Sequence, residues 1–472
     1  MRNTRNSKNN NGSASLKIFT TWSDDVLSGG RLDAKYWLPA IRELQKAIQN
    51  GKYKSQKLGD FITAIRYGLS TANDYVDFGI PFLRILNLKN DGIDVSNVVY
   101  LSEDQKDEIG KAVVHEGDLL ISRSGSVGIV VVVPKEAENF AFGSFMIKFC
   151  LNEKINKQFI AAWLNSEASR KLIEREKIGA IQGNITIETI KNFDIPIPPL
   201  SVQNEVVKKI QEAYEQKKKK ETEILKILSS IDDFVLGELG IDMPRERAER
   251  VFQIWSDEIE GRIDPFFYKP YFKTLQRAIE SKNYSELGEL VEFAKETWDQ
   301  KSVFDNQFPY IEISNIDTSN GEIAKTDFVP VAEAPSRAKM VVREGDIIVS
   351  TTRPNRGAIT PILKEQDGFI ASTGFAILRD LKNSKVLKDY LFVALRTSLS
   401  LRQMEQRTTG GNYPAITTED LRKIKIVVPD MKIQGEIVDG VKTIYEKAKR
   451  LRQEAEDVVA ETQKQVEQMI LA

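Results

Sequence analysis

The sequence repeats itself once, over nearly its whole length. Matched residues lie 228 or 231 positions apart, and the small drift marks insertions in loops. The matched pairs are Glu116-Gly117-Asp118 with Glu344-Gly345-Asp346, Ile80-Pro81 and Asn87 with Phe308-Pro309 and Asn315, Gly30-Arg31-Leu32-Asp33 with Gly261-Arg262-Ile263-Asp264, and Pro198 and Gln203 with Pro429 and Gln434. Two copies are too few for a solenoid, which needs about three repeats or more. The duplication therefore predicts two similar domains related by pseudo-twofold symmetry.

Each copy shows the pattern of a mixed α+β domain. A short helix is indicated by "LPAIRELQKAIQN" in the first copy and by "KPYFKTLQRAIES" in the second. Short apolar runs broken by Gly, Asn and Asp predict strands, as in "PFLRILNL", "VVHEGDLLISRSG", "SVGIVVVVP" and "FMIKFCL". The run "QFIAAWLNSEASRKLIERE" predicts one further helix. Each copy then ends in a proline-terminated strand and a long helix, so we expect an α+β fold with two tandem globular domains.

Both long helices carry apolar residues at alternating spacings of three and four, which is the pattern of a coiled coil. The predicted seam positions are Val207, Ile210, Tyr214, Ile224, Leu228, Ile231 and Val235 in the first helix, and Ile437, Val441, Ile444, Ala448, Leu451, Ala455 and Val458 in the second. The polar pair Lys217 and Glu221 would lie inside the first seam. An alternative is that each helix packs only on its own domain. We expect the two helices to pair as an antiparallel coiled coil about 50 Å long, holding the globular domains apart.

These features divide the chain into five predicted segments: a disordered tail at 1–15, a first globular domain at 16–200, a first long helix at 201–240, a second globular domain at 241–430 and a second long helix at 431–472. The tail is polar and basic, and no apolar stretch follows it. That composition is typical of disorder and unlike that of a signal peptide.

Composition excludes several kinds of site. The 472 residues include one cysteine, Cys150, and one histidine, His115. A disulfide within the chain is therefore impossible, and so is a Cys/His zinc site, which needs three or four ligands. No apolar run approaches the roughly eighteen residues of a membrane span, so we expect a cytoplasmic protein without a membrane partner. The net charge of −1 argues against a non-specific nucleic-acid coat protein but is compatible with local basic patches.

Three stretches resemble the specificity subunits of type I restriction-modification systems. They are "EGDLLISRSGSVG" and "EGDIIVSTTRPNRGAI" in the middle of the copies, and "IQGNITIETIKNFDIPIPPLSVQNEVVKKI" at the end of the first. The second copy departs from the last stretch, since it has "VVPDMKIQGEI" where the first has "IPIPPLSVQNEV". The resemblance covers essentially the whole chain and extends to its duplicated layout.

The resemblance implies a function, partners and cofactors. Each globular domain would be a target recognition domain that reads one half of a bipartite site in double-stranded DNA. The two helices would set the spacer between the half-sites and dock two methyltransferase (modification) subunits, which transfer a methyl group from S-adenosylmethionine to adenine N6. A restriction subunit that uses ATP and Mg could join the complex. The chain itself would hold no cofactor and catalyse nothing.

No active site emerges from the residues themselves. The run Asp264-Pro265-Phe266-Phe267 resembles the loop with which adenine methyltransferases hold their target base, but it occupies the repeat position of "DAKY" at 33–36. Neither a glycine-rich S-adenosylmethionine loop nor a Walker A pattern accompanies it. We therefore predict no catalytic residue and no metal ligand. The alternatives are a coiled-coil scaffold with two interaction domains and no DNA role, and a self-contained methyltransferase or nuclease.

Candidate DNA contacts are polar side chains on glycine-rich loops, because Arg, Asn, Gln, Ser and Thr can pair with base edges. The first copy offers Arg66, Tyr67, Ser70, Thr71, Asn73, Arg84, Ser122, Arg123, Ser124, Ser126, Gln182 and Asn184. The second offers Thr351, Thr352, Arg353, Asn355, Arg356, Arg407, Thr408, Thr409, Asn412 and Tyr413. Arg84 and Glu312 hold matching repeat positions, and their opposite charges would suit two different half-sites. The alternative for each residue is a solvated turn.

Overall fold

The computed structural model describes residues 34, 36–70, 75–110, 112–177, 183–246, 251–259, 261–299 and 304–471. The predicted tail at 1–15 lies outside these residues. The chain forms two compact units, and each is described by itself. Unit 1 comprises Met1–Lys219 with Glu454–Ala472, and unit 2 comprises Lys220–Gln453. Each unit therefore combines one β-rich region with parts of both long helices.

Unit 1 is built from short strands and helices that lead into a long helix. Its elements are α2 (Pro39–Gln49), β1 (Ser55–Lys57), β2 (Ile62–Tyr67), β3 (Ile80–Leu83), β4 (Leu88–Lys89), β5 (Gly92–Ile93), β6 (Val99–Leu101), α3 (Lys106–Ile109), β7 (Leu119–Ser122), β8 (Val130–Val132), β9 (Ala141–Phe142), β10 (Met146–Leu151), α4 (Lys157–Leu164), α5 (Glu167–Glu176), α6 (Ile187–Lys191), β11 (Asp194–Pro196) and the start of α7 (Leu200–Leu239).

Unit 2 repeats this order and ends in a second long helix. Its elements are α8 (Pro270–Glu280), β12 (Tyr284–Glu286), α9 (Leu287–Leu290), β13 (Val291–Ala294), β14 (Gln307–Ile311), β15 (Ile316–Asp317), β16 (Glu322–Ile323), β17 (Asp327–Pro330), β18 (Ala338–Val341), β19 (Ile347–Ser350), β20 (Ile359–Pro361), β21 (Ile370–Ser372), β22 (Phe375–Leu381), α10 (Lys388–Arg396), α11 (Ser398–Gln406), α12 (Thr418–Arg422), β23 (Lys425–Val427) and most of α13 (Met431–Leu471).

The two units share one sheet topology. A four-stranded antiparallel sheet has the order β2-β10-β7-β8 in unit 1 and β13-β22-β19-β20 in unit 2. A second sheet contains one parallel pair, β3 with β9 or β14 with β21. An antiparallel pair, β1 with β11 or β12 with β23, closes each unit next to its long helix. Unit 2 adds strand β18 to its second sheet. The α+β fold and the internal repeat predicted from the sequence are thus confirmed.

The repeated Glu-Gly-Asp run forms a turn that enters the central strand of each unit. Gly117 and Gly345 have φ values of 83° and 81°, a conformation that favours glycine. The Asp118 carboxylate accepts hydrogen bonds from the His115 amide (2.9 Å) and from Lys148 Nζ (2.9 Å). In unit 2 the Asp346 carboxylate accepts in the same way from the Arg343 amide (2.8 Å) and from the Arg379 guanidinium (3.0 Å).

Burial and charge pairing explain why this aspartate is structural. Asp118 is 8% exposed and Asp346 is 1% exposed, and buried carboxylates are tolerated when they are paired and hydrogen-bonded. Burial opposes ionisation of Asp118, but hydrogen bonds from Cys150, Lys148 and the His115 amide lower its pKa below the ordinary value. Burial and the Asp118 carboxylate in turn raise the pKa of the Cys150 thiol to about 11, so the chain's one thiol is poorly reactive.

The predicted helix over "QFIAAWLNSEASRKLIERE" is wrong in one respect, because it is two helices, α4 and α5. Asn165 leaves the helix because its amide pairs with both backbone groups of Val130: Oδ1 accepts from Val130 N (3.0 Å) and Nδ2 donates to Val130 O (2.6 Å). Ser166 then begins α5, since its hydroxyl accepts from the Ser169 amide.

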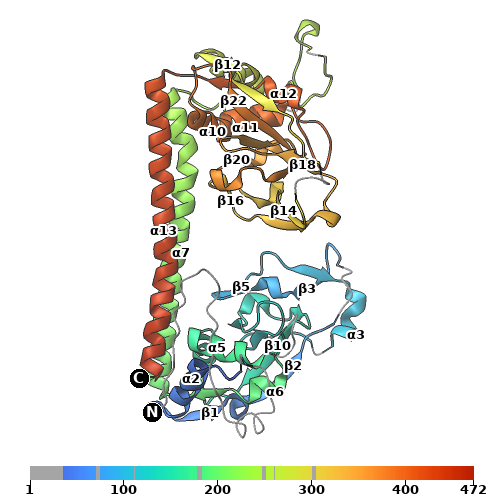
Figure 1. Cartoon of the computed structure of the whole chain (residues 1–472). Coiled ribbons are helices and arrows are strands. Elements are labelled where there is room, and N and C mark those ends of the chain that lie inside the picture. The colour runs from blue at the N-terminus through green and yellow to red at the C-terminus, as the bar shows by residue number, and fades with distance from the viewer. Residues whose placement is uncertain are drawn as a thin grey trace. The chain divides into compact units, whose positions relative to one another are not determined.

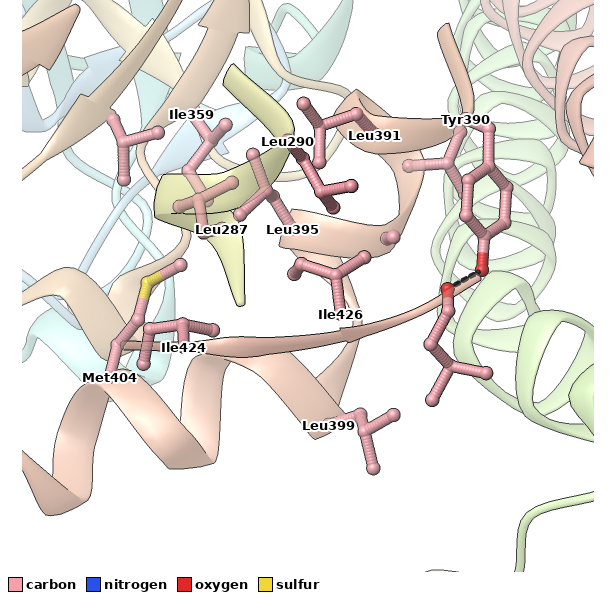
Figure 2. Close-up of a cluster of buried hydrophobic side chains, with 14 of the residues drawn as sticks. Leu287, Leu290, Ile359, Tyr390, Leu391, Leu395, Leu399, Met404, Ile424 and Ile426 are labelled. Carbon is pink, nitrogen blue, oxygen red and sulfur yellow. Dashed lines mark hydrogen bonds between the residues drawn. The ribbon is translucent and has the colours of Figure 1, made fainter. Parts of the chain in front are cut away.

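The core of unit 2 lies between its antiparallel sheet and helices α10 and α11. Leu287, Leu391 and Leu395 meet Ile359 and Ile426 there (Figure 2). The Tyr390 hydroxyl donates to the Val427 carbonyl at 2.7 Å inside this core (Figure 2), so its polar atom is satisfied. Packing of this kind gives the loops at the strand ends a rigid support.

Helices α7 and α13 pair side by side in an antiparallel arrangement (Figure 1). In unit 2, Ile224 packs with Ala448 and Leu451, whereas Val235 shares a core with Ile437. Residue numbers therefore rise along one helix as they fall along the other. Lys447 Nζ also lies 3.7 Å from the Glu223 carboxylate. The predicted antiparallel pairing is confirmed.

The seam of α13 follows the prediction, and that of α7 follows it in part. Ile437, Val441, Ala448, Leu451 and Ala455 are buried, and Ile444 and Val458 are half-buried. In α7, Ile224 and Val235 are buried, whereas Val207, Ile210, Tyr214, Leu228 and Ile231 are half-buried.

The beginning of α7 departs from the predicted register. Val206 and Ala213 are buried there, one position before the predicted Val207 and Tyr214. Val206 belongs to the core of unit 1, together with Val466 of α13. Glu221 is exposed and does not lie inside the seam. The helix ends thus pack on the units, and the section around Ile224 pairs helix with helix, so both interpretations of the periodicity hold in different places.

Candidate DNA interface

The candidate loops begin where the central strand of each antiparallel sheet ends, at Ser122 and Ser350. Both serines are fully buried. Ser122 Oγ donates to the Ser126 carbonyl (2.5 Å) and accepts from the Ile129 amide (2.8 Å), and Ser350 Oγ donates to the Thr352 carbonyl (2.7 Å). These hydroxyls therefore fold the loop back on itself. The Ser122 hydroxyl is inaccessible, which argues against its predicted contact with DNA.

The residue after each serine is held by the same two backbone hydrogen bonds. The Arg123 amide donates to the Phe145 carbonyl (2.9 Å), and the Arg123 carbonyl accepts from the Ile185 amide (3.1 Å). In unit 2 the Thr351 amide donates to the Gly374 carbonyl (2.8 Å), and the Thr351 carbonyl accepts from Ile416 (2.9 Å). We call this arrangement the shared backbone frame. It brings three separate segments of the chain together in each unit.

In unit 1 the frame carries an arginine that stacks on a tyrosine. The Arg123 guanidinium lies 4.7 Å from the ring centroid of Tyr67, which is 40% exposed at the end of β2. Arg123 Nη1 donates to the Ser144 carbonyl (3.4 Å), and the Tyr67 hydroxyl accepts from the Ile187 amide (3.2 Å). Arg123 and Tyr67, predicted from separate motifs, are thus brought into contact.

Arg84 forms a second stack in unit 1, over Tyr75 at 5.7 Å. Its position is fixed by Asn87, whose Oδ1 accepts from the Arg84 amide (2.8 Å). In unit 2 the Asn315 Oδ1 accepts from the Glu312 amide in the same way (2.6 Å). The matched positions of Arg84 and Glu312 therefore carry opposite charges on equivalent backbone. Sequence reasoning missed Tyr75, because no motif marks it.

The remaining candidates of unit 1 differ in accessibility. Ser70 and Ser126 are exposed, and Arg66 and Asn184 are half-buried. Ser124 is 3% exposed, which argues against its predicted contact with DNA. Thr71, Asn73 and Gln182 lie outside the described residues.

In unit 2 the loop after β19 meets the loop before α12. The Arg353 guanidinium stacks on the Tyr413 ring at 4.7 Å, and its Nη2 donates to the Asn412 carbonyl at 2.7 Å. The Arg353 amide donates to the Pro414 carbonyl (2.7 Å). Bridges from Thr352 and Thr409 to the same residue, Ala415, tie the two loops together.

The other unit 2 candidates divide into exposed and restrained side chains. Asn355, Arg356, Thr409, Asn412 and Tyr413 are exposed. Thr351 and Thr352 are half-buried, and Thr351 Oγ1 donates to the Gly374 carbonyl (2.9 Å).

Arg407 and Thr408 are held by the protein itself. Arg407 lies 3.9 Å from the Asp420 carboxylate and stacks on Phe267, and Thr408 Oγ1 donates to the Glu405 carbonyl (2.8 Å). These two residues support the loop, and the exposed group offers the side chains that can reach a ligand.

Charge pairing separates the loop arginines from the structural ones. Arg379 pairs with Asp346 and Glu296, and Arg402 pairs with Glu246 and Glu405. Among the described residues, Arg84, Arg123 and Arg353 have carbonyl and tyrosine partners but no carboxylate within ion-pair distance. A guanidinium held without a carboxylate keeps its charge for an external anion or acceptor.

A cavity of about 430 Å³ borders the unit 2 loops, and Asp264 and Phe266 of the Asp-Pro-Phe-Phe run line it. The Asp264 carboxylate accepts from Arg262 Nε (2.9 Å) and from the Phe267 amide (3.1 Å), so it caps its own turn. Arg262 also donates to the carbonyls of Arg407 and Thr408. This run therefore braces the loop.

The described residues contain no group of three or more His, Cys, Asp or Glu side chains that could hold a metal ion. None of their helices is long and apolar enough to span a membrane.

Sequence reasoning also missed a tyrosine that links each long helix to its unit. Tyr214 was predicted only as a seam residue, but its hydroxyl donates to the Asn90 carbonyl (2.9 Å) in the β4–β5 turn. Its counterpart 231 positions later, Tyr445, hydrogen-bonds Arg396, which donates to Thr318 in the β15–β16 turn (3.0 Å). Burial raises the pKa of both tyrosines. A tyrosine at the same position of both copies was the available signal.

Comparisons with known proteins agree with this architecture. A family model described as the type I restriction modification DNA specificity domain matches residues 50–233 and 279–459. A putative type I restriction enzyme specificity subunit, MjaX of Methanocaldococcus jannaschii, is 23% identical over 428 residues, covering 86% of this chain and 90% of that protein. The EcoKI specificity subunit of Escherichia coli K12 is 21% identical over 450 residues, covering 92% of this chain and 87% of that protein.

One solved structure of the same kind spans a similar length. The type I restriction-modification S subunit from M. genitalium has a TM-score of 0.40 and 15% identity, covering 89% of this chain and 96% of that one. The family model, by contrast, matches more than half of the present chain and includes most of both sequence copies. The chain therefore belongs to the type I restriction modification DNA specificity domain family.

Proposed function

We propose that this chain is the DNA-specificity subunit of a type I restriction-modification complex, and that each unit reads one half of a bipartite, asymmetric site. The observation that carries the proposal is the shared backbone frame. The hydrogen bonds around Arg123 and Thr351 are the same, whereas the side chains on them differ. A fixed frame with different side chains suits two readers of different base sequences, because base identity is read by side-chain donors and acceptors.

The paired helices would set the spacer and dock the partner proteins. The two helices and their tyrosine links recur in both copies, so they offer two similar surfaces to one kind of partner. Two methyltransferase (modification) subunits fit that duplication, and a restriction subunit would join where the system also cleaves. Such a complex would work in the compartment that holds the DNA, which we propose is the cytoplasm.

The cofactors would belong to the partners. S-adenosylmethionine would bind the modification subunit, and ATP with Mg would bind the restriction subunit. In this division of labour the present chain positions the complex on DNA and catalyses no step itself. The self-braced Asp264 turn supports that assignment, since its carboxylate is occupied by Arg262 and the Phe267 amide.

A methylome tests the proposal. The chain is co-expressed with its cognate modification subunit in a host without DNA methylation, and N6-methyladenine is mapped at single-base resolution. A split, asymmetric motif with a fixed gap, absent when this chain is omitted, is the expected result. Methylation that is absent despite a purified complex, or identical without this chain, would refute it.

The salt dependence of DNA binding distinguishes the proposed DNA reader from the scaffold alternative. A DNA reader that neutralises several phosphates should lose affinity steeply as salt rises, because counterions are released on binding. The purified complex is titrated with duplex DNA at several salt concentrations. An interaction scaffold without a DNA role predicts no such binding.

A further inference from the structure

One residue of the unit 2 loop, Arg353, has a left-handed backbone conformation, and glycine occupies the equivalent position in unit 1. Arg353 lies in the left-handed region, with φ 49° and ψ 51°. Three positions after Ser122, Gly125 has φ 69°, and Arg353 lies three positions after the equivalent Ser350. Later in each loop Gly128 and Gly357 also have positive φ. Both loops therefore have a positive φ three residues after the buried serine, and unit 2 keeps an arginine where unit 1 has glycine.

A side chain at such a position needs a reason. A β-carbon in the left-handed region crowds the following carbonyl, so glycine is the usual occupant. Strained residues of this kind persist when the surrounding structure holds them, and they gather at ligand-binding sites. Among the described residues, Asn139 is the other non-glycine residue with positive φ, and asparagine tolerates that conformation.

The protein holds the Arg353 side chain in place and leaves it available. Stacking on Tyr413 and the bond from Nη2 to the Asn412 carbonyl fix the plane of the guanidinium. Tyr413 is 71% exposed and Arg353 is half-buried, so the tyrosine side of the stack lies at the surface of the loop. Arg353 has no carboxylate within ion-pair distance among the described residues, unlike Arg343, which pairs with Glu296. The remaining N–H groups can therefore donate to a ligand.

We propose that Arg353 reads a guanine in the half-site recognised by unit 2, a proposal that rests on the function proposed above. Guanine presents two acceptors, O6 and N7, on its major-groove edge, and the planar guanidinium matches them with two parallel N–H groups. Adenine offers N7 beside an N6 donor, so one of the two bonds would be lost. A pre-oriented guanidinium loses less freedom on binding than a solvated one.

The decisive variant is Arg353→Gly, which installs the residue of unit 1. This variant removes the guanidinium and also the steric strain of a β-carbon at positive φ, so it should fold at least as stably as the parent. Arg353→Lys keeps the charge without the forked pair of donors. Arg277→Ala is the matched control, because Arg277 is an exposed arginine on α8 of the same unit.

Two readouts are taken from the complex of the full chain with its modification subunit. The methylome of each variant is compared with that of the parent, and duplexes carrying each of the four bases at every half-site position compete for binding. The expected result is that one guanine of one half-site becomes degenerate in Arg353→Gly and Arg353→Lys. Preference for that guanine should fall by about 10- to 100-fold, while the other half-site and the Arg277→Ala motif stay unchanged.

Each other outcome overturns the assignment. An unchanged motif means that Arg353 reads no base. A uniform loss of affinity over all sequences, with a smaller salt slope, means that it contacts phosphate. If Arg353→Gly abolishes methylation, the competition still ranks the four bases, and an undiminished guanine preference refutes the role. A parent complex without any split motif would instead sink the proposed function, so the two failures are distinguishable.

Discussion

Arg123 of unit 1 occupies the backbone position that Thr351 holds in unit 2, so the two loops offer a direct exchange of residues. We expect Arg123→Thr to alter the half-site read by unit 1 and to leave the other half unchanged. The variant removes the stack on Tyr67 at a position whose backbone bonds tolerate threonine in unit 2. A forked arginine–base contact contributes about 1–3 kcal/mol of discrimination. Methylome mapping of the variant complex checks the change.

The control is Lys135→Thr, at an exposed position of unit 1 outside the candidate loops, and it should leave both half-sites unchanged. If Arg123→Thr weakened both half-sites equally, Arg123 would act on the whole complex and not on the half-site of unit 1.

The buried pair of Asp118 with Lys148 gives a stability prediction. Lys148 is 7% exposed, and Asp118 is its one carboxylate partner among the described residues. Asp118→Asn leaves that ammonium buried and unpaired, which should lower the free energy of unfolding by about 3–5 kcal/mol at pH 7. Urea unfolding followed by circular dichroism measures the loss.

The pH dependence of this effect has a definite sign. The folded-state pKa of Asp118 lies below its ordinary value, so the stabilisation is fully present above about pH 4 and is lost as the pH falls through the folded-state pKa. The parent and Asp118→Asn should therefore converge in stability as the pH drops well below 4. A difference that stays constant through that range would contradict the ionic role.

Asp346→Asn in unit 2 is the matched comparison for Asp118→Asn. Arg379 keeps a second carboxylate, Glu296 (2.7 Å), after Asp346 is neutralised. Its cost should therefore be smaller, about 1–2 kcal/mol. If both variants lost the same free energy of unfolding, the second carboxylate partner of Arg379 would not be what reduces the destabilisation.

At the scale of elements, the two long helices pack tightly in unit 2 where Gly440 of α13 faces Phe234 of α7. A β-carbon there would collide with the ring of Phe234 on α7. Alanine normally favours a helix over glycine by about 1 kcal/mol, but overpacking at a close contact costs about 1–3 kcal/mol. We expect Gly440→Ala to lower the unfolding free energy, and Phe234→Leu in that background to restore part of it.

Gly435 provides the control on the same helix. No heavy atom lies within 4 Å of a β-carbon built there, so Gly435→Ala should raise stability by up to about 1 kcal/mol. Opposite signs for the two glycines would establish contact with Phe234 as the cause. Stabilisation by both substitutions would show that α7 yields at this point.

Sequence periodicity predicted the elements that local residues determine. The long helices, the seam of α13 and the alternation of helices and strands follow from spacing and turn residues. The break between α4 and α5 was not predictable, because the competing partner of Asn165 is the distant Val130 backbone. The register of early α7 was missed for a similar reason, since Val206 faces a core that includes the distant Val466.

The candidate interface was predictable by residue type but not by geometry. Glycine-rich loops pointed to Arg123 and Arg353, yet the stacking of Arg353 on Tyr413 joins segments far apart in the sequence. Buried hydroxyls such as Ser122 look identical to exposed ones in a sequence. Only the fold distinguishes a side chain that folds a loop from one that meets a ligand.

At the scale of the whole molecule, duplication separates what must be constant from what can vary. The Asp118 and Asp346 turns, the shared backbone frame and the tyrosine links recur in both units, and all of them are structural. The exposed side chains on the frame differ between the units. Under the function proposed above, new specificity would arise by changing the loop side chains, without rebuilding the sheets or the helices that carry them.

If the paired helices α7 and α13 set the distance between the two half-sites, shortening both helices should shorten that gap. Deleting one heptad from each helix, Gln216–Thr222 from α7 and the facing Leu451–Asp457 from α13, keeps the seam in register, since Val458 then takes the place of Leu451. Each helix loses about 10 Å, which corresponds to about three base pairs of DNA. We expect the methylome to show the same two half-sites with a gap shorter by about that number.

A two-residue deletion in each helix is the control, because it turns the seam by about 200°, away from the partner helix, and should abolish complex formation. Methylation with an unchanged gap after the heptad deletion would show that the helices do not set the spacer. Altered half-sites with an unchanged gap would assign the spacing to the recognition loops instead. A shortened gap with intact half-sites would separate the two tasks of the chain, base reading in the loops and distance in the helices.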